Sequence, residues 1–369
     1  MRTPSIILAT LTSSGESKSP SSRARRLLEE AIAARAFPGA AVAVWHRGRA
    51  FEIYAGRFTY ETSPQVDAHT IYDIASLTKV VAVTAMAMAL FERGKLTLEQ
   101  PVAKLLPQFA SGGDPRRREV TIRQLLSHSS GLPAHLKLYE QTQGKQVITA
   151  LACAAGLKAT PGERMAYSDI GFIVLGALLE KAAGVTLDAF CKREIFAPLK
   201  MTDTMFLPPK TLQPRIPPTV EDKIFRKRVV CGEVHDENSS AMGGVAAHAG
   251  VFSTASDIRA FSACLLNGGA PVFKPATISL FTRREDSPEG TTRALGWDTP
   301  SAASQAGRYF SNHSFGHLGY TGTSLWIDPE RELAIVMLSN RTWPDDRSQL
   351  IKQVRPAVHD VIIEGLGIA

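Results

Sequence analysis

The chain of 369 residues is 44% hydrophobic and 21% charged, with a formal net charge of +7. These ordinary values exclude a disordered, collagen-like or coiled-coil chain and allow a sizeable core. The basic runs at 116–118 and 223–228 hold almost no interleaved aromatic residues, which predicts solvated faces rather than a nucleic-acid interface.

Cysteine spacing and the apolar stretches exclude further classes. Cys153, Cys191, Cys231 and Cys264 lie far apart without a C-x-x-C pair, so we expect free thiols rather than a zinc site or a disulfide framework. No uninterrupted apolar run approaches the roughly 18 residues of a membrane-spanning helix, so no integral membrane segment is expected.

The N-terminal residues 1–22 are rich in Ser, Thr and Pro, which predicts a flexible tail. Within them, Arg2 precedes an apolar run at 6–11, and no A-x-A site comes after it. This is a poor signal peptide, so the sequence leaves export open.

The first ordered elements combine helix and strand. Residues 23–35 have helical periodicity. Residues 40–45 and 50–55 are strand-like and flank a turn at 46–48, a pattern that predicts a hairpin.

The residue pattern then changes from strand-like to mostly helical. Residues 75–93 are rich in Ala, Val and Met without Gly or Pro, and Gly94 comes next, which predicts a buried helix with a Gly stop. From 95 to 245, amphipathic stretches such as 121–126 and 171–183 alternate with Pro- and Gly-containing loops, and no long strand pattern is apparent.

The last third returns to a mixed pattern. Residues 254–267 predict a helix, 324–328 and 332–339 predict two strands joined by a turn, and 345–365 predict a closing helix.

The order of elements predicts an α/β fold. We expect a sheet domain built from residues 23–94 and 246–369, interrupted by a mostly helical insertion at 95–245.

Several catalytic motifs are absent from the sequence: H-E-x-x-H, G-x-x-x-x-G-K-[ST], G-x-G-x-x-G and G-x-S-x-G. The chain does contain one S-x-x-K, at Ser76 and Lys79, which opens the predicted helix 75–93. Residues three apart share a helix face, and a lysine beside a serine can activate the hydroxyl as a nucleophile. The alternative is a Ser N-cap with an exposed Lys, but the apolar residues 80–83 favour a buried helix.

Two further segments carry candidate site residues. Tyr167 and Asp169 stand before the apolar helix 171–183, where a phenol near a lysine could be held as phenolate and act as general base. The alternative there is an aromatic anchor with Asp169 as N-cap. His317 and Gly319 come directly before a strand, where glycine permits close approach of a substrate backbone.

A rival to the last segment, His248-Ala249-Gly250, precedes a helix-like run and is less favoured. His235, Asp236 and Glu237 invite a metal site, but three consecutive residues cannot all face one ion, so we favour a loop hydrogen-bond network. His128 is interpreted as structural.

These segments, in this order, resemble the motif set of the serine β-lactamase, penicillin-binding protein, DD-peptidase and esterase superfamily. The resemblance covers roughly residues 25–365. It extends to residues 74–79, 125–132 and 319–323, and the stretch 232–250 is similar to a subgroup of β-lactamase-like hydrolases and penicillin-binding proteins. The resemblance implies a β-lactamase/transpeptidase-like fold, with an antiparallel sheet flanked by helices.

The resemblance also implies a mechanism. Ser76 would form an acyl-enzyme after losing its proton to Lys79 and Tyr167, and the oxyanion would lie between the backbone N–H groups of Ser76 and Tyr320. No metal or organic cofactor is implied. The expected substrates are small molecules or peptidoglycan-type peptides, and the expected location is the exported or periplasmic space of a bacterium.

Two departures from the family pattern bear on the substrate. Asp169 replaces the usual Asn, and an ionised Asp could instead pair with Lys79 and shift base duty toward Tyr167. His317 and Leu318 replace the Lys and Thr of K-T-G, which removes a permanent charge and a hydroxyl. We therefore expect hydrolysis of an ester or a D-amino-acid peptide. A β-lactamase and a non-turnover penicillin-binding or sensor module are the alternatives.

Overall fold

The computed structural model describes residues 19–111 and 113–369. Most of the predicted tail, residues 1–18, lies outside the described residues. Helix α1 (Pro20–Ala33) begins three residues before the predicted start, so the boundary of the tail at residue 22 is wrong. The Ser19 side chain accepts the backbone N–H of Ser22 and Pro20 occupies the first turn, two features that favour an earlier helix start.

A five-stranded sheet in the order β2-β1-β10-β9-β8 forms the body of the molecule, and all its neighbouring strands are antiparallel. Its strands are β1 (Gly39–His46), β2 (Arg49–Gly56), β8 (Phe315–Leu318), β9 (Ser324–Asp328) and β10 (Leu333–Ser339). The predicted hairpin at 40–55 and the predicted strand pair at 324–339 are confirmed. Edge strand β8 was not predicted, because its sequence Phe-Gly-His-Leu holds few residues typical of strands.

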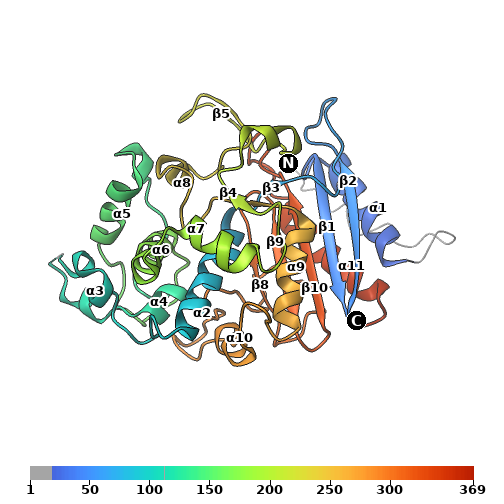
Figure 1. The fold of residues 1–369 in the computed structure, drawn as a ribbon. Coiled ribbons are helices and arrows are strands. Elements are labelled where there is room, and N and C mark those ends of the chain that lie inside the picture. The colour runs from blue at the N-terminus through green and yellow to red at the C-terminus, as the bar shows by residue number, and fades with distance from the viewer. Residues whose placement is uncertain (1–18, 112) are drawn as a thin grey trace.

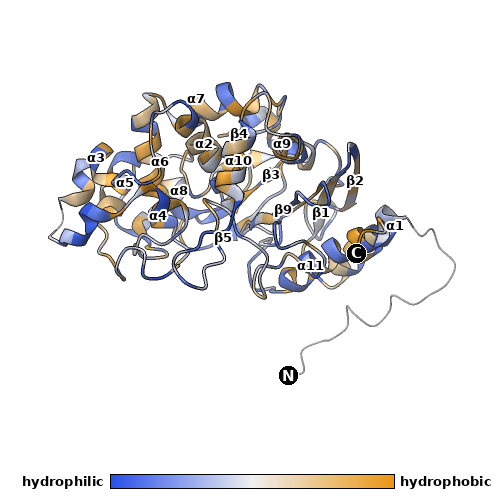
Figure 2. Ribbon diagram, turned by 90° about the horizontal axis from the view of Figure 1, so that it is seen from below, coloured by the Kyte–Doolittle hydropathy of each residue, from blue (hydrophilic) through white to orange (hydrophobic). Residues whose placement is uncertain are grey.

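Helices cover both faces of this sheet. In Figure 2, α9 (Ala255–Leu266) lies on one side of it, and α1 and α11 (Ile351–Gly365) lie on the other. The closing helix begins at Ile351 rather than at the predicted residue 345. Asp345 instead accepts the backbone N–H and the guanidinium of Arg347, which favours a turn.

Most of the remaining helices lie in the left half of Figure 1, away from α1 and α11. The helices there are α3 (Val102–Leu105), α4 (Ile122–Leu126), α5 (Lys145–Ala154), α6 (Asp169–Ala183), α7 (Leu187–Cys191), α8 (Glu237–Ala241) and α10 (Pro275–Thr282). Short strands are β3 (Tyr72–Asp73), β4 (Met205–Phe206), β5 (Val220–Asp222), β6 (Arg228–Val230) and β7 (Val251–Ser253). Shorter helical turns are η3 (Pro107–Ala110), η4 (Pro115–Glu119), η5 (Leu138–Glu140), η6 (Lys192–Phe196) and η7 (Lys210–Arg215).

The predicted buried helix 75–93 is helical but not regular. It consists of a 3-10 turn η1 (Ala75–Leu77), a π-helical segment η2 (Lys79–Thr84) and the α-helix α2 (Ala85–Glu92). The Thr84 hydroxyl donates to the Lys79 carbonyl over 2.8 Å, which stabilises the wider π turn. Such π segments occur often at functional sites.

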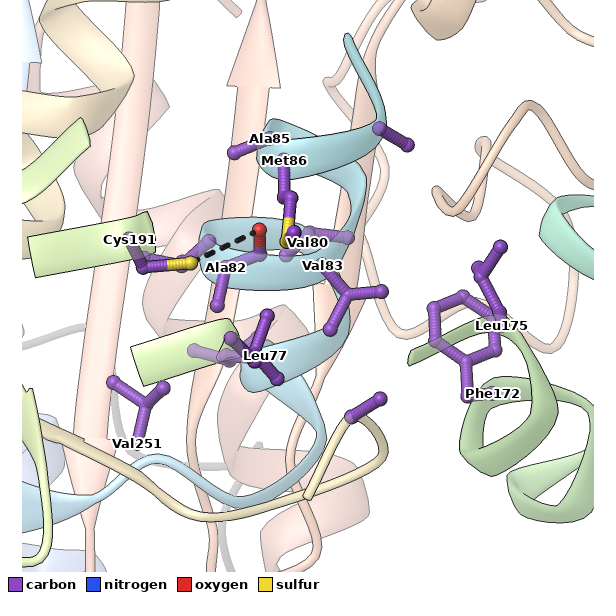
Figure 3. Packing of buried hydrophobic residues seen from close by; sticks show 14 of the residues in the cluster. Leu77, Val80, Ala82, Val83, Ala85, Met86, Phe172, Leu175, Cys191 and Val251 are labelled. Carbon is purple, nitrogen blue, oxygen red and sulfur yellow. Dashed lines mark hydrogen bonds between the residues drawn. The ribbon is translucent and has the colours of Figure 1, made fainter. Parts of the chain in front are cut away.

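This segment is the centre of the larger hydrophobic core. Figure 3 shows Val80, Val83 and Met86 among apolar neighbours, with the Cys191 thiol donating to the Ala82 carbonyl over 3.6 Å. By length and composition the Ala75–Glu92 helix could cross a membrane, but 83% of it is buried inside the protein. It is the core helix of the fold.

Candidate active site

Ser76 lies at the start of the buried helix, in a turn with unusual backbone geometry. The preceding Ala75 has φ +47°, a left-handed conformation that costs a non-glycine residue about 1–3 kcal/mol. The Asp73 carboxylate accepts the Ala75 N–H at 2.8 Å, and Thr321 and Thr323 donate to the carbonyls of residues 73 and 74. These contacts hold the turn, and with it the Ser76 hydroxyl, in one position.

Lys79 is fully buried, and its ammonium group has three close acceptors. Its Nζ lies 3.0 Å from Ser76 Oγ, 2.8 Å from the His248 carbonyl oxygen and 2.8 Å from Asp169 Oδ1. Burial opposes the charge, but the Asp169 carboxylate and the Tyr167 hydroxyl outweigh it, so the pKa of Lys79 is raised. The ion pair with Asp169 that the sequence allowed is therefore present, and Lys79 is a cation at rest.

Tyr167 reaches the same point from the loop before α6. Its hydroxyl is within hydrogen-bonding reach of Lys79 and Ser76, and Lys79 Nζ lies 4.9 Å from the centre of its ring. Burial raises the pKa of Tyr167 above its ordinary value despite the nearby ammonium. A raised pKa favours the protonated phenol at rest over the phenolate that the sequence allowed, and Asp169, which pairs with Lys79, adds to the effect of burial.

The α6 start is capped by Ser168 and not by Asp169, which corrects the alternative interpretation of this segment. The Ser168 hydroxyl accepts the Gly171 N–H and donates to the Pro133 carbonyl. Its own N–H donates to Nδ1 of the buried His128, whose ring lies 4.6 Å from that of Tyr167. His128 is thus structural, as expected, and it holds the Tyr167 loop in place.

His317, Gly319 and Tyr320 form the opposite wall, at the end of edge strand β8. His317 is buried, and burial together with Arg293 and Lys79 holds its pKa well below the usual value, so the ring is neutral. Its Nδ1 donates to the Leu318 carbonyl at 2.8 Å. A side chain at Gly319 would collide with Thr323 and the Ile74 carbonyl, which explains the glycine.

Two residues at this point, Ser76 and Tyr320, have backbone N–H groups without an acceptor in the described part of the chain. Both residues line the same hollows. Free amides in such a position can receive the negative charge of an oxyanion.

Two hollows meet at the serine. The first hollow has a volume of about 850 Å³ and is bordered by residues 135–140, strand β5 with the turn after it (220–225), and residues 344–347. The second hollow, about 450 Å³, is bordered by Arg293, residues 317–320 and the start of α11. Ser76, Tyr167 and Tyr320 line both hollows, so the serine hydroxyl lies where an acyl group and a leaving group could separate.

The second hollow holds cationic residues that the sequence analysis missed: Arg293, Arg341, Lys352 and Arg355. Arg341 and Arg355 are 7% and 4% exposed, and neither has an ion pair with a carboxylate among the described residues. Burial and the neighbouring Arg341 lower the pKa of Arg355 to about 9. One signal could have found Arg355, because it lies within the buried stripe of α11 beside Val354 and Val358.

Residues 235 and 236 of the segment 235–237 take part in a hydrogen-bond network. The His235 N–H donates to Asp73, and Asp236 caps α8 by accepting the Ser239 N–H at 2.7 Å. Asp236 Oδ1 also lies 2.7 Å from Nε2 of His248.

The expectation that His248-Ala249-Gly250 precedes a helix-like run is wrong, because strand β7 begins directly after it at Val251. His248 reaches the site through its carbonyl oxygen, which accepts from Lys79.

A sheet covered on both faces, with a half-buried serine and a buried lysine of a Ser-x-x-Lys motif beside a tyrosine, defines the class of β-lactamase/transpeptidase-like serine hydrolases. The family model described as Beta-lactamase matches residues 24–358, and the chain belongs to that family. It is a serine hydrolase of the β-lactamase family.

Relatives with similar sequences carry a more specific name. The protein named "Putative D-alanyl-D-alanine carboxypeptidase" in Escherichia coli strain K12 is 33% identical over 320 residues, which are 78% of this chain and 73% of that one. The protein of the same name in Salmonella agona strain SL483 is 32% identical over 303 residues, covering 74% and 70%.

Solved structures share the fold. EstCE1, described as a hydrolase with promiscuous acyltransferase activity, has a TM-score of 0.76 at 23% identity and covers 93% of this chain and 99% of its own. A penicillin-binding protein homologue from Caulobacter crescentus has a TM-score of 0.76 at 18% identity, covering 95% and 99%. These likenesses confirm the expected fold class.

Proposed function

We propose that this protein is a carboxypeptidase-like hydrolase that forms an acyl-enzyme on Ser76 and acts on peptides ending in a D-amino acid with a free carboxylate. The observation that carries the acyl-enzyme is the contact of 3.0 Å between Ser76 Oγ and Lys79 Nζ, at the meeting point of two hollows. Relatives named for D-alanyl-D-alanine carboxypeptidase activity support the substrate class.

Tyr167 is the proposed base of the first step. Asp169 keeps Lys79 protonated, so the group that gains activity on losing a proton is the Tyr167 phenol. Its phenolate would take the Ser76 proton as Oγ attacks the carbonyl carbon, and the resulting phenol would protonate the leaving nitrogen. The same group would then activate water for hydrolysis of the ester on Ser76.

The second hollow favours a leaving group with a carboxylate over a neutral alcohol. Buried guanidinium groups without a carboxylate partner are unfavourable alone and gain from a bound anion. Arg355 and Arg341 are in this situation. His317 is neutral, so it adds no positive charge of its own for the anion. The two arginines would supply the charge that the missing lysine of K-T-G would otherwise provide.

The acyl-enzyme is tested with Ser76→Ala. We expect hydrolysis of D-Ala-D-Ala peptides, or of p-nitrophenyl acetate where it is turned over, to fall by several orders of magnitude, about 10³-fold or more, with an unchanged melting curve. Intact-mass spectrometry should show an acyl adduct on the wild type and none on the variant. Retained turnover by the variant would refute the assignment of Ser76.

The carboxylate preference is tested with a pair of peptides that differ only in a free or amidated C-terminus. We expect the free acid to be preferred by about 10-fold or more in kcat/KM, and Arg355→Gln to remove most of that preference by raising KM. Equal rates on both peptides in the wild type would favour the esterase alternative. Rapid turnover of nitrocefin would favour the β-lactamase alternative, and a lasting penicillin adduct would favour the non-turnover one.

A further inference from the structure

Lys79 depends on a contact outside the three motifs. One of its three close acceptors is the carbonyl of His248, at 2.8 Å, in the loop between α8 and β7. Because an ammonium group has only three protons, the direction of this bond helps to decide where the other two point. The other groups that compete for these two protons are Ser76 Oγ, Asp169 Oδ1 and the Tyr167 hydroxyl.

The His248 ring is fixed by a carboxylate. Its Nε2 lies 2.7 Å from Asp236 Oδ1, and the side chain is 1% exposed. The same Oδ1 atom accepts the Ser239 N–H that begins α8. Asp236 therefore joins the start of α8 to the residue whose carbonyl receives the Lys79 ammonium.

We propose that Asp236 and His248 are positioning residues: the bond between carboxylate and ring fixes the His248 carbonyl, which in turn aims the Lys79 ammonium at Ser76 Oγ. This inference rests on the proposed function, in which the Lys79 charge assists Tyr167 and Ser76. The ring is not a base for the reaction, because its remaining nitrogen, Nδ1, is enclosed and has no hydrogen-bond partner among the described residues.

The loop has other anchors, so the two roles can be separated. The Ser239 hydroxyl donates to the Ala249 carbonyl at 2.9 Å, and the Val251 N–H donates to the Thr78 hydroxyl at 3.1 Å. Both contacts are independent of the His248 ring. Loss of the ring contact should therefore displace the His248 carbonyl without unfolding the loop.

A matched pair of variants isolates the contact. Asp236→Asn retains an oxygen at the same reach, which can accept both the ring N–H and the Ser239 N–H. Asp236→Ser retains an N-cap acceptor for α8 but is too short to reach the ring. Both changes remove the charge, so a difference between them reports the hydrogen bond to His248. Thr254→Ala, which removes the cap of α9, is the control for general destabilisation.

We expect Asp236→Asn to keep kcat within about threefold of the wild type, and Asp236→Ser to lose about 10- to 100-fold in kcat with KM little changed. His248→Ala should show the same loss, and the double variant with Asp236→Ser should be no slower than the worse single variant. Thr254→Ala should lower the melting temperature while leaving kcat unchanged.

Three results would overturn the proposal: full activity of Asp236→Ser, an equal loss in Asp236→Asn, or additive losses in the double variant. Failure of the proposed function would look different, since Ser76→Ala would then retain turnover whatever the Asp236 variants do.

Discussion

Asp169 contributes to the raised pKa of two other groups in the site, Lys79 and Tyr167. Its own pKa is depressed, because Lys79 and His135 outweigh the cost of burying it. An Asn at position 169 would leave the positive charge of Lys79 free to stabilise a Tyr167 phenolate, whereas Asp169 pairs with that charge.

We therefore predict that Asp169→Asn moves the ascending limb of the pH profile of kcat/KM to lower pH. The carboxylate favours the protonated forms of both Lys79 and Tyr167, so its removal lowers both pKa values. The measurement is kcat/KM from about pH 6 to about pH 11.5 for both proteins, a range that includes the ordinary pKa values of tyrosine and lysine, about 10 and 10.4. An unchanged limb, or one moved to higher pH, would contradict the role assigned to Asp169.

A second residue-scale prediction concerns Asp73 beneath the nucleophile turn. Burial raises the pKa of this carboxyl from 3.8 to about 6, although two N–H groups donate to it. A raised pKa in the folded state contributes stability that is complete below about pH 3.8 and is lost as pH rises through about 6. The free energy of unfolding, compared with that of Asp73→Asn, should fall by about 3 kcal/mol between about pH 3 and pH 7.

Urea titrations of both proteins at several pH values would measure this difference. The variant supplies the baseline, since its residue 73 does not titrate. A constant difference across the range would show that Asp73 has an ordinary pKa.

The catalytic pair was predictable because it is local, and the cationic hollow was not because it is assembled at a distance. Ser76 and Lys79 are three residues apart, so helix geometry alone places them together. Tyr167 and His317 were singled out by their positions before a predicted helix and a predicted strand, and only the resemblance placed them in one site with Ser76. Arg293, Arg341 and Arg355 come from three separate segments, and no local pattern indicates that they converge.

At the scale of elements, the π-helical segment distinguishes the actual core helix from the predicted one. Its sequence, Lys-Val-Val-Ala-Val-Thr, is compatible with an α-helix, and the wider turn depends on Thr84 and on packing around it. Gly296 leaves the space that the Thr84 side chain fills, since any side chain there would collide with it. Such a distant fit leaves no periodic signal in the sequence.

Thr84→Val tests the contribution of this hydroxyl. The change conserves shape and removes one hydrogen bond to the buried Lys79 carbonyl, so we expect a loss of about 1–3 kcal/mol in the free energy of unfolding. Chemical denaturation gives the value. The control is Thr342→Val. Thr342 is also fully buried, but its hydroxyl has no hydrogen-bond partner among the described residues. An equal loss of unfolding free energy in both variants would show that the Thr84 hydrogen bond adds no stability.

The element boundaries that were wrong share a physical cause. Helix α1 starts early because a serine and a proline favour its first turn, and α11 starts late because Asp345 stabilises a turn instead. Caps and turn contacts act within a few residues of a boundary, whereas hydrophobic periodicity averages over many. The type of each of these elements, helix or strand, was therefore easier to predict than the residues at which it begins and ends.

At the scale of the whole molecule, one hydrophobic cluster joins the sheet to the helical region. It includes Ala43 and Val336 of the sheet, Val80 of the buried helix and Phe172 of α6. The sequence pattern predicts an insertion at 95–245, but the helices of that segment share this core with the strands. Continuity of the core argues for cooperative unfolding.

We accordingly predict a single unfolding transition in guanidinium chloride. Far-ultraviolet circular dichroism, which reports helices, and near-ultraviolet circular dichroism, which reports aromatic packing, should give the same midpoint. A plateau between two separated transitions would show that the sheet domain and the helical insertion unfold independently.

The pair of hollows also affects the fate of the acyl-enzyme. Under the proposed function, departure of the leaving group would empty the second hollow while the acyl chain still occupied the first. Water would then approach Ser76 through the second hollow. Its arginines would also attract the carboxylate of a second amine, such as a free D-amino acid. Added D-amino acids should thus compete with water for the acyl group on Ser76. The ratio of acyl exchange to hydrolysis would then depend on the second hollow rather than on the acyl chain in the first.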